Sequence, residues 1–128
     1  MSGGTATREI AIVDDDDAVR DSMRAVLESL GFAVHDYRSA VDFLARRNAD
    51  SAESCLLLDL HMPVMTGLDL LEFMQANGPR IPTIVITGRG NSDLRDKALR
   101  SGAVALIDKP VTGNALLGAL DSAFAAAA

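Results

Sequence analysis

Cysteine, tryptophan and long apolar stretches are scarce or absent in this chain of 128 residues. The single cysteine, Cys55, excludes an internal disulfide framework. Because Cys55 opens the apolar run 55–58, we expect a buried, unreactive thiol. No apolar run approaches the roughly 20 residues of a membrane span, and residues 1–9 lack the apolar core of a signal peptide. The expected compartment is therefore the cytoplasm.

Basic and aromatic residues are also few. Lysine and arginine total 12 against 18 acidic residues, which gives a formal net charge of −6. This balance argues against direct nucleic-acid binding and favours a cationic ligand or a basic protein surface. Aromatic residues make up 4% of the chain while hydrophobic residues reach 48%, so the core must be aliphatic. The length suits one domain.

Short apolar runs alternate with segments of helical periodicity. The runs lie at residues 10–13, 33–37, 55–58, 83–86 and 104–107, and the helical segments at 19–30, 39–47, 66–77, 92–101 and 112–124. This order predicts an α/β fold with a parallel sheet, right-handed crossovers and helices on both faces. We expect the domain to span residues 9–126 after a flexible leader at 1–8, with the four terminal alanines fraying.

Two of the predicted helices have a clear apolar face. The first places Val19, Met23, Val26, Leu27 and Leu30 on one side and ends before Gly31, and the last places Leu116, Leu117, Leu120 and Phe124 on its inner side. Ser39, followed by Asp42, resembles a capping box at the start of the second helix.

Polar residues stand where the predicted strands end. Asp14 and Asp15 follow the first strand, Asp59 the third, Thr87 the fourth and Lys109 the fifth. Ligands of an open α/β sheet bind beyond the carboxyl ends of its strands. The spacing therefore brings three acids, a hydroxyl and an amine to one edge.

This set of groups suits phosphoryl transfer at a metal site. Asp14 and Asp15 follow a buried strand, where adjacent carboxylates repel unless a cation lies between them. Few other ligands are present, which favours Mg²⁺. Asp59 stands apart and is the candidate nucleophile for an aspartyl phosphate. Lys109 and the metal would neutralise the charge of the incoming phosphoryl group, and the Thr87 hydroxyl would bond one of its oxygens.

Other acids in the same loop have a simpler explanation. Asp16 and Asp17 are expected to lie in a solvated loop, where one or the other caps the first helix. An EF-hand is excluded, because the required glycine and the terminal glutamate are absent. His61 has no second His, Cys or carboxylate at ligand spacing, which favours an exposed loop position over a role for its ring as a metal ligand.

Several motifs resemble those of bacterial response-regulator receiver domains, in the right order and over about residues 9–126. They are Ile-Val-Asp-Asp-Asp at 12–16, Asp-Leu-His-Met-Pro at 59–63 with Gly67, Ile-Thr-Gly at 86–88 and Asp-Lys-Pro at 108–110. The resemblance implies a flavodoxin-like (βα)5 doubly wound fold with strand order 2-1-3-4-5. The stretch 86–90 resembles receivers that precede helix-turn-helix outputs.

The resemblance also implies roles for particular residues. Asp59 would accept a phosphoryl group from a histidine kinase, and Mg²⁺ would bind Asp14, Asp15, Asp59 and the backbone carbonyl of His61. Thr87 would be the switch hydroxyl, and Lys109, before a cis Pro110, would contact the phosphate. Such a domain is a signalling phosphoacceptor that promotes only its own phosphorylation and dephosphorylation.

The implied partners are a histidine kinase or phosphotransfer protein on one side, and a downstream protein or an attached output domain on the other. A phosphorylation-dependent homodimer and a stand-alone receiver both stay open, and neither membrane nor nucleic acid is expected as a direct partner. Leu106 departs from the family, which places an aromatic switch residue there. The expected output face is the fourth helix, fifth strand and fifth helix.

Three other functions are disfavoured. A haloacid-dehalogenase-type phosphatase would use Asp14 and Asp16 but needs an acidic motif after its lysine, and Asp121 is the only acid after Lys109. A phosphate-independent pseudo-receiver does not require all five site residues, and FMN binding needs a Ser/Thr-rich loop after the first strand.

Two large side chains flank the expected phosphate. His61 and Arg89, each two residues beyond a site residue, either shield the phosphate from water or point into solvent.

Overall fold

The computed structural model describes residues 8–48, 50, 52–88 and 92–127, and there the chain alternates five strands with five helices. The strands are β1 (Glu9–Val13), β2 (Ala33–Tyr37), β3 (Glu53–Asp59), β4 (Thr83–Thr87) and β5 (Ala105–Asp108). The helices are α1 (Asp17–Ser29), α2 (Ala40–Arg46), α3 (Gly67–Asn77), α4 (Ser92–Arg100) and α5 (Gly113–Ala127). Of the expected leader at residues 1–8, only Arg8 lies within the described residues.

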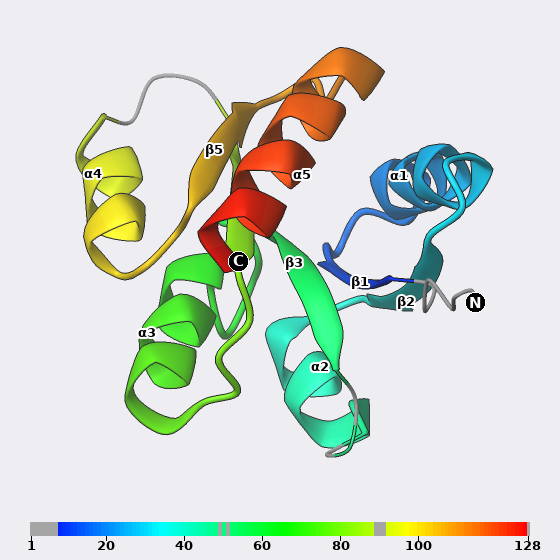
Figure 1. Cartoon of the computed structure of the whole chain (residues 1–128). Helices are drawn as coiled ribbons and strands as arrows, with labels where there is room; N and C mark the ends of the chain where they lie inside the picture. Colours follow the sequence, from blue (N-terminus) through cyan, green and yellow to red (C-terminus); the bar gives the residue numbers. More distant parts are fainter. Residues whose placement is uncertain (1–7, 49, 51, 89–91, 128) are drawn as a thin grey trace.

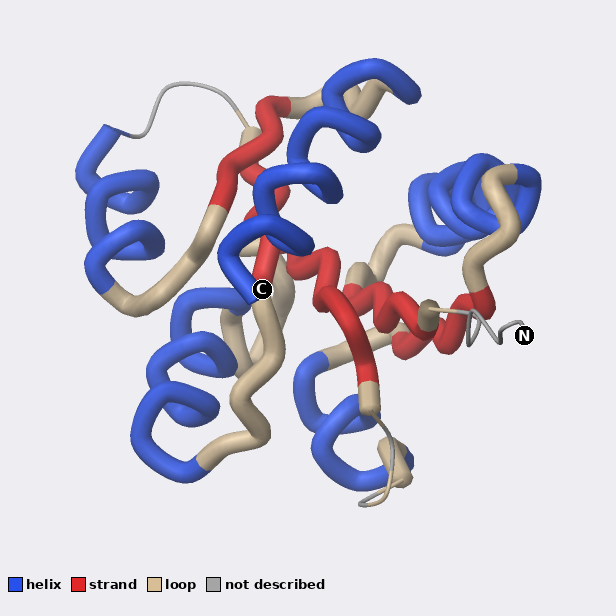
Figure 2. The backbone as a smooth tube through the Cα atoms, in the orientation of Figure 1, coloured by secondary structure: helices blue, strands red, loops and turns tan. Residues whose placement is uncertain are grey.

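All strand pairs are parallel, and the sheet order is β2-β1-β3-β4-β5. The flavodoxin-like fold and its strand order are therefore confirmed. Helices cover both faces, with α1 and α5 on one side of the sheet and α2, α3 and α4 on the other (Figure 1). Figure 2 shows the strands at the centre, between the two helical layers.

Successive strand residues supply two separate cores because their side chains alternate between the faces. Leu56 and Leu58 of β3 pack towards α2, α3 and α4, whereas Cys55 and Leu57 pack towards α1 and α5. All four side chains are fully buried, so a continuous apolar run was the correct signal for a strand covered on both faces. The expectation of a buried thiol at Cys55 is also confirmed, and burial raises its pKa to about 12.

Side-chain caps fix where the helices begin. Asp16 accepts the Val19 N–H at the start of α1, as expected of a capping aspartate. Ser39 caps α2 by accepting the Asp42 N–H. The predicted capping box at this helix is only half correct, because the Asp42 carboxylate accepts from the Arg38 N–H and not from Ser39.

Two details of the predicted helices are wrong. Leu30 and Leu117, expected on inner faces, are 44% and 41% exposed, because Leu30 lies just beyond α1 and Leu117 is one residue out of phase with Leu116 and Leu120. Ala119 and Ala123 fill the inner face of α5 instead. Of the four terminal alanines expected to fray, Ala128 lies outside the described residues, and α5 is helical through Ala127. Within the described part of the chain, no helix has both the length and the apolarity that a membrane crossing requires.

Candidate functional site

The five predicted site residues meet at the carboxyl edge of the sheet. Asp14 follows β1 directly, Asp59 ends β3, Thr87 ends β4 and Lys109 follows β5. Asp14, Asp59 and Thr87 are at most 1% exposed, while Asp15 lies in the loop and is exposed. Because each of these residues lies at or just after the end of a strand, the pattern could be detected in the sequence.

Three carboxylates form a tight acidic cluster. Each of Asp14, Asp15 and Asp59 offers an oxygen, and these oxygens lie within 4.8 Å of one another. Asp14 Oδ2 is buried and accepts no hydrogen bond from any described residue. Burial is the main reason that the pKa of Asp14 rises to about 6, the nearby Asp59 charge adds to the rise, and the Asp16 N–H opposes it. An orphaned buried oxygen among three carboxylates fits a divalent cation.

Asp59 lies between an amine and a backbone N–H. Its Oδ1 atom is 3.3 Å from Lys109 Nζ and accepts the His61 N–H at 3.2 Å. The Lys109 side chain is one-third exposed, so its ammonium reaches a buried carboxylate from the rim of the site. The exposed position predicted for His61 is confirmed, and the Lys109–Pro110 bond is cis as the resemblance implied.

A glycine allows α3 to approach the site. A Cβ atom on Gly67 would lie 2.2 Å from the backbone oxygen of Asp59, a distance that any larger residue would have to relieve by moving one of the two segments. The sequence pointed to Gly67 only as part of a motif, and the structure gives the physical reason for it. In the same loop Val64 adopts φ 69° and is 95% exposed, which is unusual for a β-branched residue.

Thr87 connects the site to the neighbouring strand and loop. Its hydroxyl donates to the Gly88 carbonyl at 3.0 Å, and its own carbonyl accepts the Lys109 N–H at 2.9 Å. Leu106, at the family's aromatic position, is half-buried and packs against the core on the α3 and α4 side. Arg89, the other residue considered as a phosphate shield, lies outside the described residues.

One residue near the site had no signal in the sequence. Arg20 on α1 donates from Nη1 to the backbone carbonyl of Asp14 at 2.9 Å. The sequence of a charged helix such as α1 does not indicate which arginine makes such a contact, because the acceptor is a backbone atom outside the helix.

Comparisons with known proteins agree with this arrangement. The family model for the response regulator receiver domain matches residues 10–121. The chain is 40% identical to the response regulator protein TodT of Pseudomonas putida over 89% of its own length and 50% of that protein. It is 37% identical to the transcriptional regulatory protein FixJ of Azorhizobium caulinodans, over 87% of this chain and 52% of the relative.

A solved structure similar to this chain, a crystal structure titled FixJ-N, superimposes with a TM-score of 0.85 at 36% identity. That match covers 94% of this chain and 96% of the other, whereas the chain spans only about half the length of the curated relatives above. With the family model matching most of the chain and the acidic cluster in place, this chain belongs to the response regulator receiver domains, the phosphoacceptor modules of two-component signalling.

Proposed function

We propose that Asp59 accepts a phosphoryl group from a histidine kinase or a phosphotransfer protein, in a Mg²⁺-dependent reaction that switches protein–protein contacts. The observation that carries this assignment is the surroundings of Asp59. It is a buried carboxylate clustered with Asp14 and Asp15, and its Oδ1 atom is 3.3 Å from the Lys109 ammonium.

The reaction is a transfer between two side chains. An Asp59 carboxylate oxygen attacks the phosphorus of a phosphohistidine, the new O–P bond forms, and the P–N bond breaks. The imidazole leaves with the electron pair and takes up a proton. Since the donor histidine belongs to another protein, this chain supplies the acceptor and the groups that neutralise charge.

Each neighbouring residue has a role in this scheme. Asp14, Asp15, Asp59 and the His61 backbone carbonyl would hold Mg²⁺, which when bound offsets negative charge on the transferred group. Lys109 would bind a phosphoryl oxygen, a contact for which its ammonium already lies close to Asp59.

The signal leaves the site through Thr87. Its hydroxyl now donates to Gly88, and it would turn to donate to a phosphoryl oxygen. This exchange changes the face made of α4, β5 and α5, where Leu106 replaces the aromatic switch residue. The partner that reads this face is a downstream protein, an attached output domain or a second copy of the chain. The similarity to FixJ, a transcriptional regulatory protein, favours transcriptional regulation as the output.

The decisive experiment is intact mass measurement after incubation with a small phosphodonor such as phosphoramidate. We expect one added phosphoryl group, dependent on Mg²⁺ and prevented by chelator, and none on an Asp59→Asn variant. Modification of Asp59→Asn, or modification that survives the chelator, would contradict the assignment.

A matched control lies in the same acidic loop. Asp16→Asn removes a neighbouring charge but keeps the helix cap, because asparagine caps as well as aspartate does. We expect this variant to be phosphorylated as the unmodified sequence is. Loss of modification in Asp16→Asn would mean that the net charge of the loop, and not the triad, governs the reaction.

A further inference from the structure

The Arg20 guanidinium joins three segments of the chain. Nη1 donates to the Asp14 carbonyl at 2.9 Å, Nη2 donates to Asp17 Oδ1 at 2.6 Å, and Nε lies 3.5 Å from Asp36 Oδ2. These three partners belong to the loop directly after β1, the first turn of α1 and strand β2. The Arg20 side chain is only 14% exposed, and although Asp17 is exposed, the contact with the Asp14 carbonyl is partly buried.

The contact with the Asp14 carbonyl matters because that oxygen belongs to the peptide unit joining Asp14 to Asp15. The Asp14 N–H on the other side of the residue donates to the Tyr37 carbonyl at 3.1 Å. The backbone of Asp14 is therefore held from both directions, by β2 and by Arg20. Asp15 is exposed in the loop, so the orientation of this peptide unit sets the direction in which the Asp15 side chain leaves the backbone.

We propose that Arg20 is a positioning residue that holds the Asp14 and Asp15 carboxylates in the arrangement that binds a divalent cation. The inference rests on the proposed function, in which the cation binds Asp14, Asp15 and Asp59. Mutation of a residue that does not bind the metal but orients its ligands typically changes metal affinity by about 10- to 100-fold.

Charge and positioning predict opposite effects at this residue. A guanidinium close to the site repels a cation, so a role through charge alone means that neutralising Arg20 strengthens cation binding. If Arg20 orients the ligands, neutralising it weakens cation binding despite the lost repulsion. The direction of the change in affinity therefore separates the two roles.

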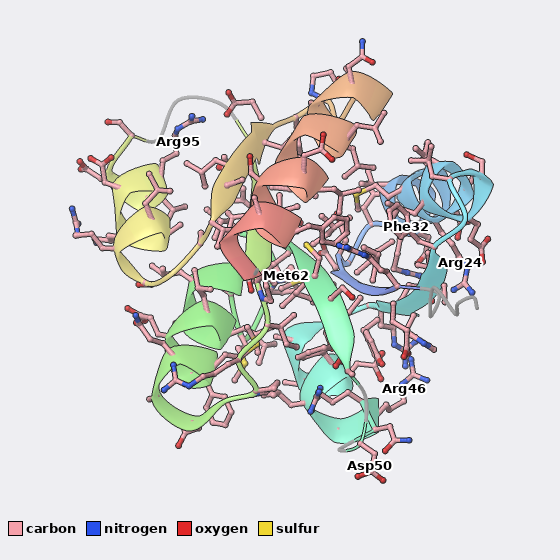
Figure 3. The ribbon with its side chains drawn as sticks, in the orientation of Figure 1. Arg24, Phe32, Arg46, Asp50, Met62 and Arg95 are labelled. Atoms are coloured by element: carbon pink, nitrogen blue, oxygen red, sulfur yellow. The ribbon has the colours of Figure 1, made fainter. Side chains whose placement is uncertain are left out.

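Arg24 provides a matched control one turn further along α1. Its Nη1 lies 3.1 Å from Asp36 Oδ1 and its Nε 3.3 Å from Glu28 Oε2. Arg24 thus shares the Asp36 partner and the helix face, on the β2 side of α1 (Figure 3), but its contacts are with Asp36 and Glu28 and not with the Asp14 carbonyl. Arg24→Met removes the same charge and the same kind of ion pair without releasing the loop.

Arg20→Lys tests geometry with the charge retained. A lysine ammonium is a compact donor and cannot reproduce a planar fork directed at three separate acceptors. We expect this variant to bind the cation with an affinity between those of the unmodified protein and Arg20→Met.

The experiment is a Mg²⁺ titration of the full chain followed by amide chemical shifts, with amide exchange recorded separately on the metal-free protein. We expect Arg20→Met to bind Mg²⁺ about tenfold more weakly and to exchange the amides of Asp15 and Asp16 faster without metal. Arg24→Met should bind Mg²⁺ as tightly as the unmodified protein or slightly more tightly, with unchanged exchange.

Each result decides the matter. Equal or tighter Mg²⁺ binding by Arg20→Met overturns the inference, and if that variant does not fold, unchanged affinity in Arg20→Lys does so. Equal weakening in Arg24→Met also overturns it, because Arg24 does not contact the Asp14 carbonyl and the loss of affinity would then not depend on that contact. If the unmodified protein binds no Mg²⁺, it is the proposed metal site that fails, and this result is distinct from a bound cation that ignores Arg20.

Discussion

Strand β3 carries a buried carboxylate at each end, and the two have opposite surroundings. At its first residue, the Glu53 side chain is 2% exposed and accepts two hydrogen bonds from the Arg47 guanidinium, at 2.8 and 3.2 Å. At its last residue, Asp59 is equally buried but lies beside Asp14, whose Oδ2 atom has no partner among the described residues.

The two ends of β3 therefore differ in role. The bidentate contact from the Arg47 guanidinium satisfies the Glu53 carboxylate within the chain itself. At the other end the chain gathers like charges and leaves an oxygen unsatisfied, an arrangement that costs stability until a ligand arrives. Removing a partner at the Glu53 end should therefore destabilise the protein, whereas removing a charge at the Asp59 end should stabilise it.

The largest effect is expected at the satisfied end. Arg47→Met leaves Glu53 buried without its partner, and the free energy of unfolding should fall by about 3 kcal/mol. Urea unfolding measures this change. The control is Arg46→Met, which breaks an exposed contact with Asp42 on the same helix and should have a much smaller effect. Equal losses in the two variants would remove the distinction drawn for Glu53.

The second prediction concerns Asp14 without metal. Its folded pKa of about 6 lies above the ordinary value of 3.8, so between these pH values the folded protein binds more protons than the unfolded chain. The free energy of unfolding should therefore fall as pH rises from about 4 to 6, and Asp14→Asn should raise it by about 2 kcal/mol at pH 7.

Urea unfolding in chelator at about pH 4 and about pH 7.5, near the two ends of the interval over which stability should change, tests this prediction. Asp14→Asn should show less loss of stability between them than the unmodified protein. Asp15→Asn is the control, since Asp15 is exposed and its neutralisation removes little desolvation. If Asp14→Asn is less stable than the unmodified protein at the higher pH, the charged Asp14 carboxylate does not destabilise the metal-free protein, and the prediction is wrong.

A bound cation should offset the repulsion among the carboxylates at the Asp59 end of β3. Mg²⁺ at ten times its dissociation constant should raise the free energy of unfolding by about 1.4 kcal/mol, by mass action. The same increment is expected in Arg47→Met, because that contact lies at the opposite end of β3 and distant sites act independently. Asp14→Asn should show a smaller increment or none. An increment that disappears in Arg47→Met would mean that the two ends are coupled.

The smallest effect is expected at Val64, in the loop that follows β3. Its φ of 69° strains a β-branched residue, and at 95% exposure it has little packing to lose. Val64→Gly should therefore stabilise the protein by about 0.5 kcal/mol, strain relief exceeding the added entropy of the unfolded chain. Val41→Gly, at an exposed position inside α2, should have the opposite sign because glycine disfavours a helix. Thermal unfolding of the pair compares the two signs directly.

Much of the fold was predictable because its signals are local. Alternation of apolar runs with helical periods specified the parallel sheet, and Asp16 and Gly31 marked the ends of α1 as expected. The position of Leu117 was not predictable in the same way. A leucine adjacent to an inner-face residue is inside or outside according to the exact rotation of the helix against the sheet, which depends on packing along its whole length.

The sequence by itself determined that Asp14, Asp15, Asp59, Thr87 and Lys109 share one edge, because parallel strands all end on the same side of the sheet. Only the tertiary structure decided how they differ. Asp14 is buried with a raised pKa while its neighbour Asp15 is exposed, and Arg20 reaches a backbone oxygen outside its own helix. Burial and contacts with backbone atoms depend on how separate elements pack, and the order of residue types does not encode them locally.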